Sequence, residues 1–475
     1  MTALFCSPSR KREGAGGWAR AILQRNARGE RVPTPNPSRK REGTVIRLST
    51  TDADFATRFT ALVEDRRESD AGVTQDVAAI IAAVRRDGET AIRDLTHKHD
   101  RHDLETTGWQ IDAADCKAAF DALEPELRTA LELAATRIRA YHEKQRPLDS
   151  DSVDSAGVRL GARWLPVDAA GIYVPGGRAA YPSSLLMNAI PAKVAGVGRL
   201  AMVTPTPDGQ INPLVLAAAH LAGVDEVWRV GGAQAVAALA YGAGRIAPVD
   251  VITGPGNAWV AEAKRQVYGV VGIDMVAGPS EIVVVADALN DPEWTAADLL
   301  SQAEHDTTTQ SILFTDDAGF ADKVAAAVDR QLSDLATEAV ARVAWDANGA
   351  IIVVDTLADA IPLVDRLAAE HLQLAIPDPQ GFFDRVRHAG SVFLGRYTPE
   401  AIGDYVAGPN HVLPTGRRAR FASGLSVLDF MKRTSFLALD EAALRELGPA
   451  TVALANAEGL PAHAKSVALR LRLNH

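Results

Sequence analysis

The segment 249–267, VDVITGPGNAWVAEAKRQV, decides the fold. Its first five residues are rich in β-branched side chains, which predicts a strand. The chain then turns at Gly254 and Gly256, and the alanine-rich stretch after Asn257 has helical spacing. A strand, a tight glycine turn and a helix make half of a βαβ unit, so this segment predicts a parallel sheet.

Two further segments repeat this strand-turn-helix pattern. They are GIYVPGGRAAYPSS (171–184), with the turn Pro175-Gly176-Gly177, and VWRVGGAQAVAALA (227–240), with the turn Gly231-Gly232. Glycines let a ligand approach the backbone closely, and a helix N-terminus favours an anion. Each turn alone is typical of tight loop packing, but the three together predict a cleft for a nucleotide or phosphate cofactor.

Short β-branched runs predict eight strands with helical stretches between them, at 170–174, 200–204, 226–230, 249–253, 281–286, 311–315, 350–354 and 391–394. We therefore expect an α/β fold. It should have two doubly wound, Rossmann-like lobes with parallel sheets, plus small helical N- and C-terminal domains. Ligands of such sheets bind outside the carboxyl ends of strands, so we expect functional residues in the strand-to-helix loops.

Composition excludes several protein classes. The 475 residues are 47% hydrophobic and 23% charged, which is ordinary for a globular chain. No apolar run reaches the roughly 18–20 residues of a membrane span. The two cysteines, Cys6 and Cys116, argue against a disulfide framework and fit a reducing, cytoplasmic compartment. Few aromatics and an acidic body argue against a nucleic-acid partner.

The first 44 residues differ from the rest. The heptapeptide PSRKREG occurs twice, at 8–14 and 37–43, in a basic stretch without apolar periodicity. A repeat that offers no buried face is not a folding unit. We expect residues 1–44 to be a disordered basic extension or translated upstream sequence, with Val45 as the natural start.

Three segments carry candidate ligands for a metal. In LLSQAEHD (299–306), Gln302 and His305 are three residues apart on a helix and share a face, whereas Glu304 points elsewhere. Together with a distant carboxylate and a second imidazole they would suit zinc. The other candidates lie in the expected loop 403–414, with Asp404 and His411, and in 457–466, with Glu458 and His463.

Two other histidine-containing stretches need interpretation. Glu370-His371 follows an expected helix at 358–369 and precedes a short strand, and an acid beside an imidazole can transfer protons near neutral pH. In isolation such a pair is typical of a solvated helix end. The cluster HKHDRHD (97–103) resembles a metal site but is better explained as a solvated connection between a helix and a strand.

Together these segments resemble the histidinol dehydrogenase family over about residues 46–475. The matching stretches are, in chain order, GIYVPGG, GGAQAVAAL, GPGNAWVAEAKRQV, DMVAGPSE, DLLSQAEHD, EHLQL, AGSVFLG, GDYVAGPNHVLPT and AHAKSVALR.

The resemblance implies the last two steps of histidine biosynthesis. L-histidinol is oxidised to L-histidine by two NAD⁺ in succession, through an aldehyde that is not released. Glu370 would activate the water that attacks the aldehyde, and His371 would take protons from the alcohol and the hydrate. The resemblance also implies one Zn²⁺ per subunit, held by Gln302, His305, Asp404 and His463.

The family's other site residues also have counterparts here. The resemblance implies that substrate is contacted by Ser280, Gln302, His305, His371, Asp404, Glu458 and His463. It implies that NAD is bound by Tyr173, Gln234 and Asn257. The family is a domain-swapped homodimer, so Glu458 and His463 would act in the partner's site.

The resemblance suggests these domain boundaries: an accessory domain from 46–68 and 425–450, a first α/β lobe with the metal and catalytic residues from 69–171 and 281–424, a second α/β lobe with the NAD cleft from 172–280, and a C-terminal tail from 451–475 that reaches the partner.

Three alternatives remain. A zinc hydrolase would use the same metal ligands, with Glu370 activating water, but it would not need three glycine turns. A non-catalytic binding protein would not need a complete set of catalytic residues. A dehydrogenase of another amino alcohol would keep the chemistry and change the substrate.

Overall fold

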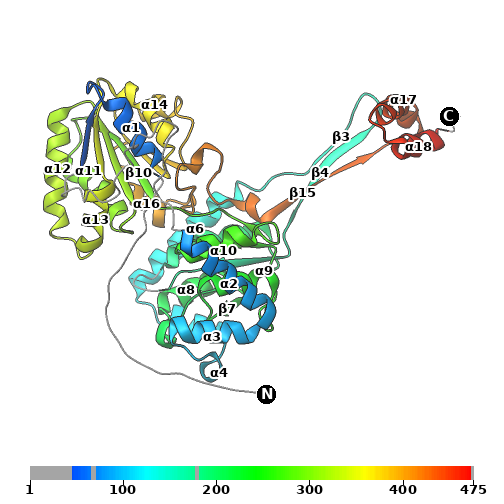
Figure 1. Cartoon of the computed structure of the whole chain (residues 1–475), viewed down its shortest axis with the longest axis horizontal. Helices are drawn as coiled ribbons and strands as arrows, with labels where there is room; N and C mark the ends of the chain where they lie inside the picture. The colour runs from blue at the N-terminus through cyan, green and yellow to red at the C-terminus, as the bar shows by residue number, and fades with distance from the viewer. Residues whose placement is uncertain (1–44, 66–70, 177–180, 472–475) are drawn as a thin grey trace, which may run out of the picture. The chain divides into compact units, whose positions relative to one another are not determined.

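The computed structural model describes residues 45–65, 71–176 and 181–471. Within these ranges the strands form three sheets, two of six strands and one of three (Figure 1). The extension 1–44 with its repeated heptapeptide, and Gly177 of the first glycine turn, lie outside the described residues.

The first six-stranded sheet is parallel throughout, in the order β1-β12-β11-β10-β13-β14. Its strands are β1 (Ile46–Ser49), β10 (Glu281–Ala286), β11 (Gln310–Thr315), β12 (Ala350–Val353), β13 (His371–Ala375) and β14 (Ser391–Leu394). β10 reads EIVVVA and is buried along its whole length, as expected for a parallel strand covered on both faces.

Helices cover both faces of this sheet. Val283 and Val285 of β10 pack in one core cluster with α1 and α14, whereas Ile282 and Val284 pack in another with α11, α12 and α13. This alternation follows from the two-residue period of a strand. The helices are α1 (Phe55–Glu64), α11 (Pro292–Ala303), α12 (Ala318–Leu332), α13 (Glu338–Asn348) and α14 (Ile361–Leu367), followed by the shorter α15 (Pro379–Phe383) and α16 (Glu400–Tyr405).

The second six-stranded sheet has the order β2-β7-β6-β5-β8-β9 and is parallel except for β2. Its strands are β2 (Gln110–Ile111), β5 (Ala169–Tyr173), β6 (Arg199–Val203), β7 (Glu226–Trp228), β8 (Val251–Thr253) and β9 (Gly272–Ile273). Ile172 of β5 packs in one core cluster and Tyr173 in another, so this sheet is also covered on both faces.

Eight longer helices accompany this sheet. They are α2 (Ala71–Asp87), α3 (Glu89–Asp100), α5 (Ala113–Asp121), α6 (Pro125–Glu143), α7 (Pro182–Ala195), α8 (Pro213–Ala222), α9 (Gly232–Tyr241) and α10 (Ala258–Val267), with the short α4 (Leu104–Thr107) after α3. The α/β class with two parallel, helix-covered sheets is therefore confirmed.

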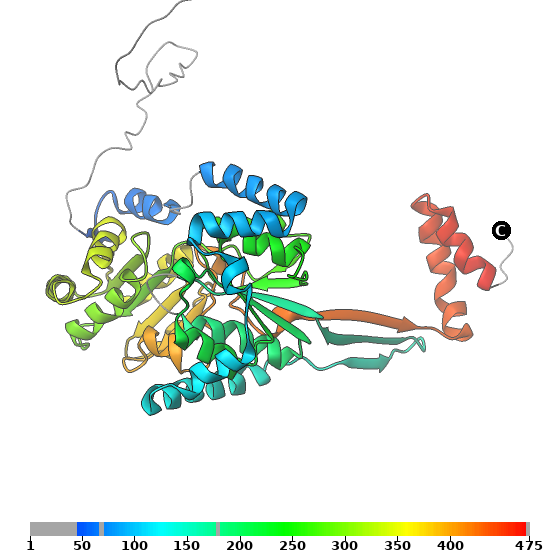
Figure 2. The same ribbon diagram turned by 90° about the horizontal axis from the view of Figure 1, so that it is seen from below.

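The third sheet is an antiparallel ribbon that the sequence did not predict. It consists of β3 (Ser150–Val153), β4 (Arg159–Pro166) and β15 (Met431–Ala438). Its strands are largely exposed, so they lack the buried face that reveals a strand in a sequence. Figures 1 and 2 show α17 (Glu441–Ala457) and α18 (Pro461–Arg470), in red, at the end of this ribbon.

The structure groups the N-terminal elements differently from the expected domain boundaries. β1 pairs with β12, and Phe59 of α1 packs in the core of the first sheet, so the described part of 46–68 is not a separate accessory domain. Leu131 of α6 packs in the same cluster as Ile172 of the second sheet, so helices of 69–171 belong with that sheet instead. The sequence did not reveal this because apolar spacing predicts a helix without predicting the sheet it covers.

Candidate functional site

The glutamate-histidine pair lies at the switch point of the first sheet. β10 has β11 on one side and β13 on the other, so the strand order reverses there. Ser280 immediately precedes β10, and Glu370 immediately precedes His371, the first residue of β13. These are the amino ends of the strands, so the expectation of strand-to-helix loops is wrong for this lobe. The pair is also buried, with Glu370 6% and His371 3% exposed, and is not a solvated helix end.

The environment of His371 defines its tautomer. Nδ1 lies 3.2 Å from the carbonyl oxygen of Glu281 and 2.9 Å from Oε1 of Gln302. Both are acceptors, so Nδ1 carries the hydrogen and donates. Nε2 is buried and has no hydrogen-bond partner among the described residues. Burial lowers the pKa of His371 to about 4, so the ring is neutral near pH 7 and Nε2 keeps its lone pair.

Glu370 is held by the same residue of β10. Its Oε2 accepts the backbone N–H of Glu281 at 3.1 Å. Burial raises the pKa of Glu370 well above its usual value, and the nearby carboxyls of Glu281 and Asp404 raise it further. A carboxyl group with this environment can accept a proton from water when a cation is bound beside it.

Gln302 lies in the last turn of α11, whereas His305 follows the C-cap Glu304 and is not in the helix, which corrects the expected shared helix face. Nε2 of Gln302 is 3.0 Å from Nδ1 of His305, so the two side chains meet as the spacing predicts. Glu304 does point elsewhere, since its Oε2 accepts the hydroxyl of Thr337 at 2.8 Å. Gln302 is fully buried and bridges His305 and His371.

Asp404 lies in α16 and not in a loop, which corrects the sequence expectation. Glycines and prolines follow it, and the loop they predict begins only after Tyr405. Burial alone would raise the pKa of Asp404, but Nδ1 of His411, 3.5 Å from its Oδ1, and the other nearby histidines lower it to about 2. The side chain is therefore an anion near neutral pH.

Glu400, in the same helix, was not predicted. It is 1% exposed, and its Oε1 lies 3.7 Å from Nε2 of His371. Burial raises its pKa to about 8, so near neutral pH it holds a proton while Asp404 is ionised. No sequence pattern distinguishes Glu400 from an ordinary acid in the first turn of a helix, where acids are favoured by the helix dipole.

These side chains form a donor set suited to a cation. Among the described residues, His371, Glu400 and Asp404 each offer one ligand atom within 4.8 Å of the others. Asp404 belongs to the predicted metal set, and Gln302 joins His371 to His305. Amide oxygen, imidazole nitrogen and carboxylate oxygen are ligands that zinc accepts. Of the four predicted ligands, Asp404 belongs to this group, and Gln302 and His305 are connected to it through His371.

His463 and Glu458 are not brought to this place by their own chain. His463 lies in α18, and Glu458 is the C-terminal cap of α17; both are exposed. Figures 1 and 2 show these two helices well apart from α11 and the other helices of the first sheet.

The three glycine turns meet at the carboxyl ends of the second sheet. The hydroxyl of Tyr173, the last residue of β5, accepts the N–H of Gly232 at 3.1 Å. Gly254 has φ +113°, and a Cβ there would lie 2.2 Å from the carbonyl oxygen of Tyr173, so only glycine fits. The strand order reverses between β5 and β8, so these turns lie where doubly wound sheets bind ligands.

The predicted cofactor residues lie on these turns. Gln234 is buried in the first turn of α9, and Oδ1 of Asn257 caps α10 by accepting the N–H of Val260 at 3.2 Å. Burial raises the pKa of Tyr173 to about 12, so it remains a neutral phenol.

A buried ion pair supports the Gly254 turn, and sequence reasoning missed it. Lys264 of α10 pairs with Asp274, and the two side chains are 2% and 1% exposed. Nζ of Lys264 donates to the carbonyl of Gly254 at 2.9 Å, and Oδ2 of Asp274 accepts the N–H of the same glycine at 2.9 Å. The backbone N–H and the carbonyl of Gly254 are thus both bonded by members of this ion pair.

The alternative histidine cluster differs from its predicted description. His97 and His99 lie in α3, whereas His102 is only 2% exposed and its Nε2 bonds the hydroxyl of Thr107 at 2.9 Å. The stretch is therefore not fully solvated, because His102 is buried. Among the described residues, its histidines and aspartates do not form a group close enough to share a metal ion.

Comparison with known proteins agrees with this geometry. The family model described as histidinol dehydrogenase matches residues 63–471. The histidinol dehydrogenase of Zymomonas mobilis is 64% identical to this chain over 427 residues, which make up 90% of this chain and 99% of that protein. The histidinol dehydrogenase of Rhodospirillum rubrum is 60% identical over 427 residues, which make up 90% of this chain and 98% of that protein.

None of the described helices has the length and apolar character to cross a membrane.

A solved structure agrees as well. The histidinol dehydrogenase of Elizabethkingia anophelis superposes with a TM-score of 0.86 at 33% identity, covering 91% of this chain and 99% of that one. This chain is therefore an oxidoreductase that belongs to the histidinol dehydrogenase family.

Proposed function

We propose that this chain oxidises L-histidinol to L-histidine with two NAD⁺ in succession, through an aldehyde that stays bound. The balanced reaction adds one water and releases two NADH and three protons when the product is a carboxylate. The observation that carries the proposal is the buried, unpartnered Nε2 of His371 beside Gln302, which also contacts His305. A neutral imidazole without a partner is the base that alcohol oxidation requires.

Gln302, His305 and Asp404 would hold a Zn²⁺ ion, and His463 of a second copy would complete the set. The bound metal would orient the imidazole and amino groups of the substrate. The anionic state of Asp404 supports this assignment, because a carboxylate ligand must be deprotonated.

His371 and Glu370 would divide the proton transfers. Nε2 of His371 would take the hydroxyl proton of histidinol and later that of the aldehyde hydrate. Glu370 would take a proton from the water that adds to the aldehyde. Burial of both side chains keeps bulk water away from the aldehyde, which supports its retention.

Tyr173, Gln234 and Asn257 would bind NAD on the glycine turns of the second sheet. NAD⁺ would accept the hydride in each oxidation. The glycines support this, because a Cβ would collide with the backbone of Tyr173 at Gly254 and with the side chain of Gln234 at Gly232, and dinucleotides bind at glycine turns before a helix N-terminus.

Ser280 and Glu458 would complete the substrate contacts, the latter from the partner subunit. We propose a homodimer in which Glu458 and His463 reach the site of the other copy. The exposed leucines of α17 and α18 support an interface, since Leu454 and Leu469 are 65% and 63% exposed in the single chain.

We also propose that the enzyme works in the cytoplasm, in the last two steps of histidine biosynthesis. The free, buried thiol of Cys116 fits a reducing compartment.

The test measures absorbance at 340 nm with purified protein, histidinol and NAD⁺, together with the bound metal. We expect two NADH per histidinol consumed, loss of activity with a chelator, and recovery with Zn²⁺. Gln302→Ala should lose metal, whereas Glu304→Gln in the same segment should keep both metal and activity. Ester or amide hydrolysis without NADH would favour a zinc hydrolase, and a faster reaction with another amino alcohol would change the substrate.

A further inference from the structure

Arg417 is a buried cation behind the catalytic pair. It follows the loop after α16, has φ +66° and is 3% exposed. Its Nη1 lies 3.0 Å from Oε1 of Glu281, and its Nη2 donates to Oε1 of Gln310 at 2.6 Å. Glu281 and Gln310 are the paired first residues of β10 and β11. One guanidinium therefore links the amino ends of two neighbouring strands.

Glu281 connects this guanidinium to both catalytic side chains. Its backbone N–H donates to Oε2 of Glu370 at 3.1 Å, and its carbonyl accepts Nδ1 of His371 at 3.2 Å. The backbone N–H of Glu281 thus orients Glu370, and its backbone carbonyl orients His371. A rotation of either peptide unit of Glu281 would move at least one of them.

The ion pair between Arg417 and Glu281 is better explained by its effect on the orientation of Glu281 than by a contribution to the stability of the fold. The carboxylate of Glu281 is 1% exposed, and a fully buried ion pair contributes little net stability compared with apolar residues of the same volume. The ion pair instead fixes the orientation of the groups around it, because a guanidinium is rigid and planar. Nη2 donates to Gln310 and, at 3.4 Å, to the carbonyl of Leu62, while the ion pair with Nη1 holds the carboxylate of Glu281.

We propose that Arg417 is a positioning residue: it fixes the side chain of Glu281 so that the backbone of Glu281 holds Glu370 and His371 in their reactive orientations. This inference rests on the proposed function for the roles of Glu370 and His371. Arg417 acts through Glu281 and is not itself assigned a contact with the reacting atoms or the cofactor.

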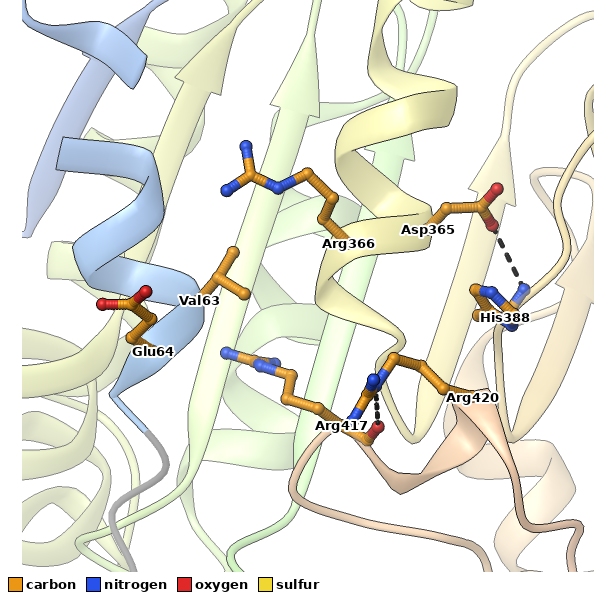
Figure 3. A pocket seen from close by; sticks show the side chains of 7 residues that line it. All are labelled: Val63, Glu64, Asp365, Arg366, His388, Arg417 and Arg420. Carbon is orange, nitrogen blue, oxygen red and sulfur yellow. Dashed lines mark hydrogen bonds between the residues drawn. The ribbon is translucent and has the colours of Figure 1, made fainter. Parts of the chain in front are cut away.

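A neighbouring cavity makes the proposal testable by chemical rescue. A cavity of about 470 Å³ is lined by Arg417 and also by Val63, Glu64, Arg366 and Arg420 (Figure 3). Arg366 and Glu64 are exposed, so small molecules in solution can reach the cavity. Removal of the Arg417 side chain would extend this cavity toward Glu281.

The experiment compares Arg417→Met, Arg417→Lys and Arg417→Ala with Arg366→Met, which alters the same cavity without a contact to Glu281. We expect kcat for histidinol to fall about 10- to 100-fold in the three Arg417 variants, since small displacements of reacting groups cost this much. The substrate KM and bound metal should change little. Arg366→Met should keep the parental kcat.

Two readouts separate positioning from general damage. Guanidinium or methylguanidinium ions should restore part of the kcat of Arg417→Ala but not of Arg417→Met, whose side chain fills the space. Arg417→Lys, which keeps the charge but cannot bridge both acceptors, covers the case in which the other variants fail to fold. A parental kcat in folded Arg417→Met or Arg417→Lys overturns the proposal.

A structural readout keeps this test independent of the proposed function. In a crystal structure of Arg417→Lys, the contacts from Glu281 to Glu370 and His371 should lengthen or break. Unchanged contacts overturn the positioning role, whatever the enzyme oxidises. A parental enzyme that does not oxidise histidinol would refute the proposed function and leave this structural comparison decisive for Arg417.

Discussion

The Nδ1 atom of His371 lies 2.9 Å from Oε1 of Gln302. The carbonyl of Glu281 accepts from the same nitrogen, so the hydrogen of the neutral ring is fixed on Nδ1. A residue of the proposed metal set thereby selects the tautomer of the proposed base. The proposed metal site and the proposed proton-transfer site share this hydrogen bond and cannot be rearranged independently.

His371→Asn should abolish most turnover and leave the metal in place. An amide cannot accept a proton near neutral pH, so we expect kcat to fall by about 10²- to 10⁴-fold. Metal content, measured by elemental analysis, should stay at the parental level because Gln302, His305 and Asp404 remain. The control is His99→Asn, an exposed histidine of α3 that should change neither value. Parental turnover in His371→Asn would remove His371 from its role.

Much of the fold was predictable because a buried parallel strand appears in the sequence as a short continuous run of β-branched residues. β10 reads EIVVVA, and the predicted strand 281–286 has the observed bounds. The ribbon of β4 and β15 was not predictable, since its residues are exposed on both sides in this chain. Its pairing joins Arg159 to Ala438, a contact between distant residues that no local pattern encodes.

The site was predictable where its residues are close in sequence or belong to a glycine turn. Gln302 and His305 meet as a three-residue spacing requires. Glu400 and Arg417 were missed because their importance comes from burial beside other groups, and burial depends on the tertiary fold. The position of Glu370 and His371 at the amino end of β13, beside that of β10, was also missed, since a general rule for doubly wound sheets pointed to the opposite ends.

Lys264→Met should weaken the proposed NAD cleft and destabilise the protein. It leaves the buried carboxylate of Asp274 without its cation, so the free energy of unfolding should fall by about 3–5 kcal/mol. Because Lys264 and Asp274 hold both ends of Gly254, the KM for NAD⁺ should rise more than the KM for histidinol.

Denaturant unfolding and steady-state kinetics check this prediction. Adding Asp274→Asn removes the unpaired charge and keeps an oxygen for the N–H of Gly254, so the double variant should regain stability. A single variant as stable as the double variant would contradict this account.

The stability of the fold should depend on pH through His142 of α6. Its Nδ1 bonds the carbonyl of Ile138 at 2.7 Å, and its Nε2 lies 3.2 Å from Nδ2 of Asn410. Asn410 is held in this orientation because its Nδ2 also donates to Met187 and its Oδ1 accepts from Val412. Nε2 must therefore act as an acceptor, so the folded ring is neutral.

Burial lowers the pKa of His142 below its unfolded value of about 6.5. Above that pH neither state takes up a proton, and the contribution is constant. As the pH falls below it, the unfolded chain binds a proton that the folded chain excludes, so the free energy of unfolding decreases by up to about 1.4 kcal/mol per pH unit. Urea unfolding between pH 5 and 8 should show a shallower slope for His142→Gln than for the parent, and equal slopes would contradict the assignment.

Mixing two inactive variants should restore activity if His463 acts in the partner's site. His371→Asn disables the site of its own subunit, whereas His463→Ala disables the site of the other. After subunit exchange, half of the dimers are mixed, and each mixed dimer has one site with both residues intact. About a quarter of parental activity should therefore return, as the two-fold symmetry of a homodimer requires.

The matched control mixes His371→Asn with Gln302→Ala, two residues that meet within one chain. A mixed dimer of these two variants would contain one intact site only if His371 and Gln302 of one chain served different sites. Because they share a site, each mixed dimer has two defective sites and activity should stay at the level of the separate variants. If His463 served its own subunit instead, the first mixture would behave like this control, and the exposed position of α18 in the single chain would need another explanation.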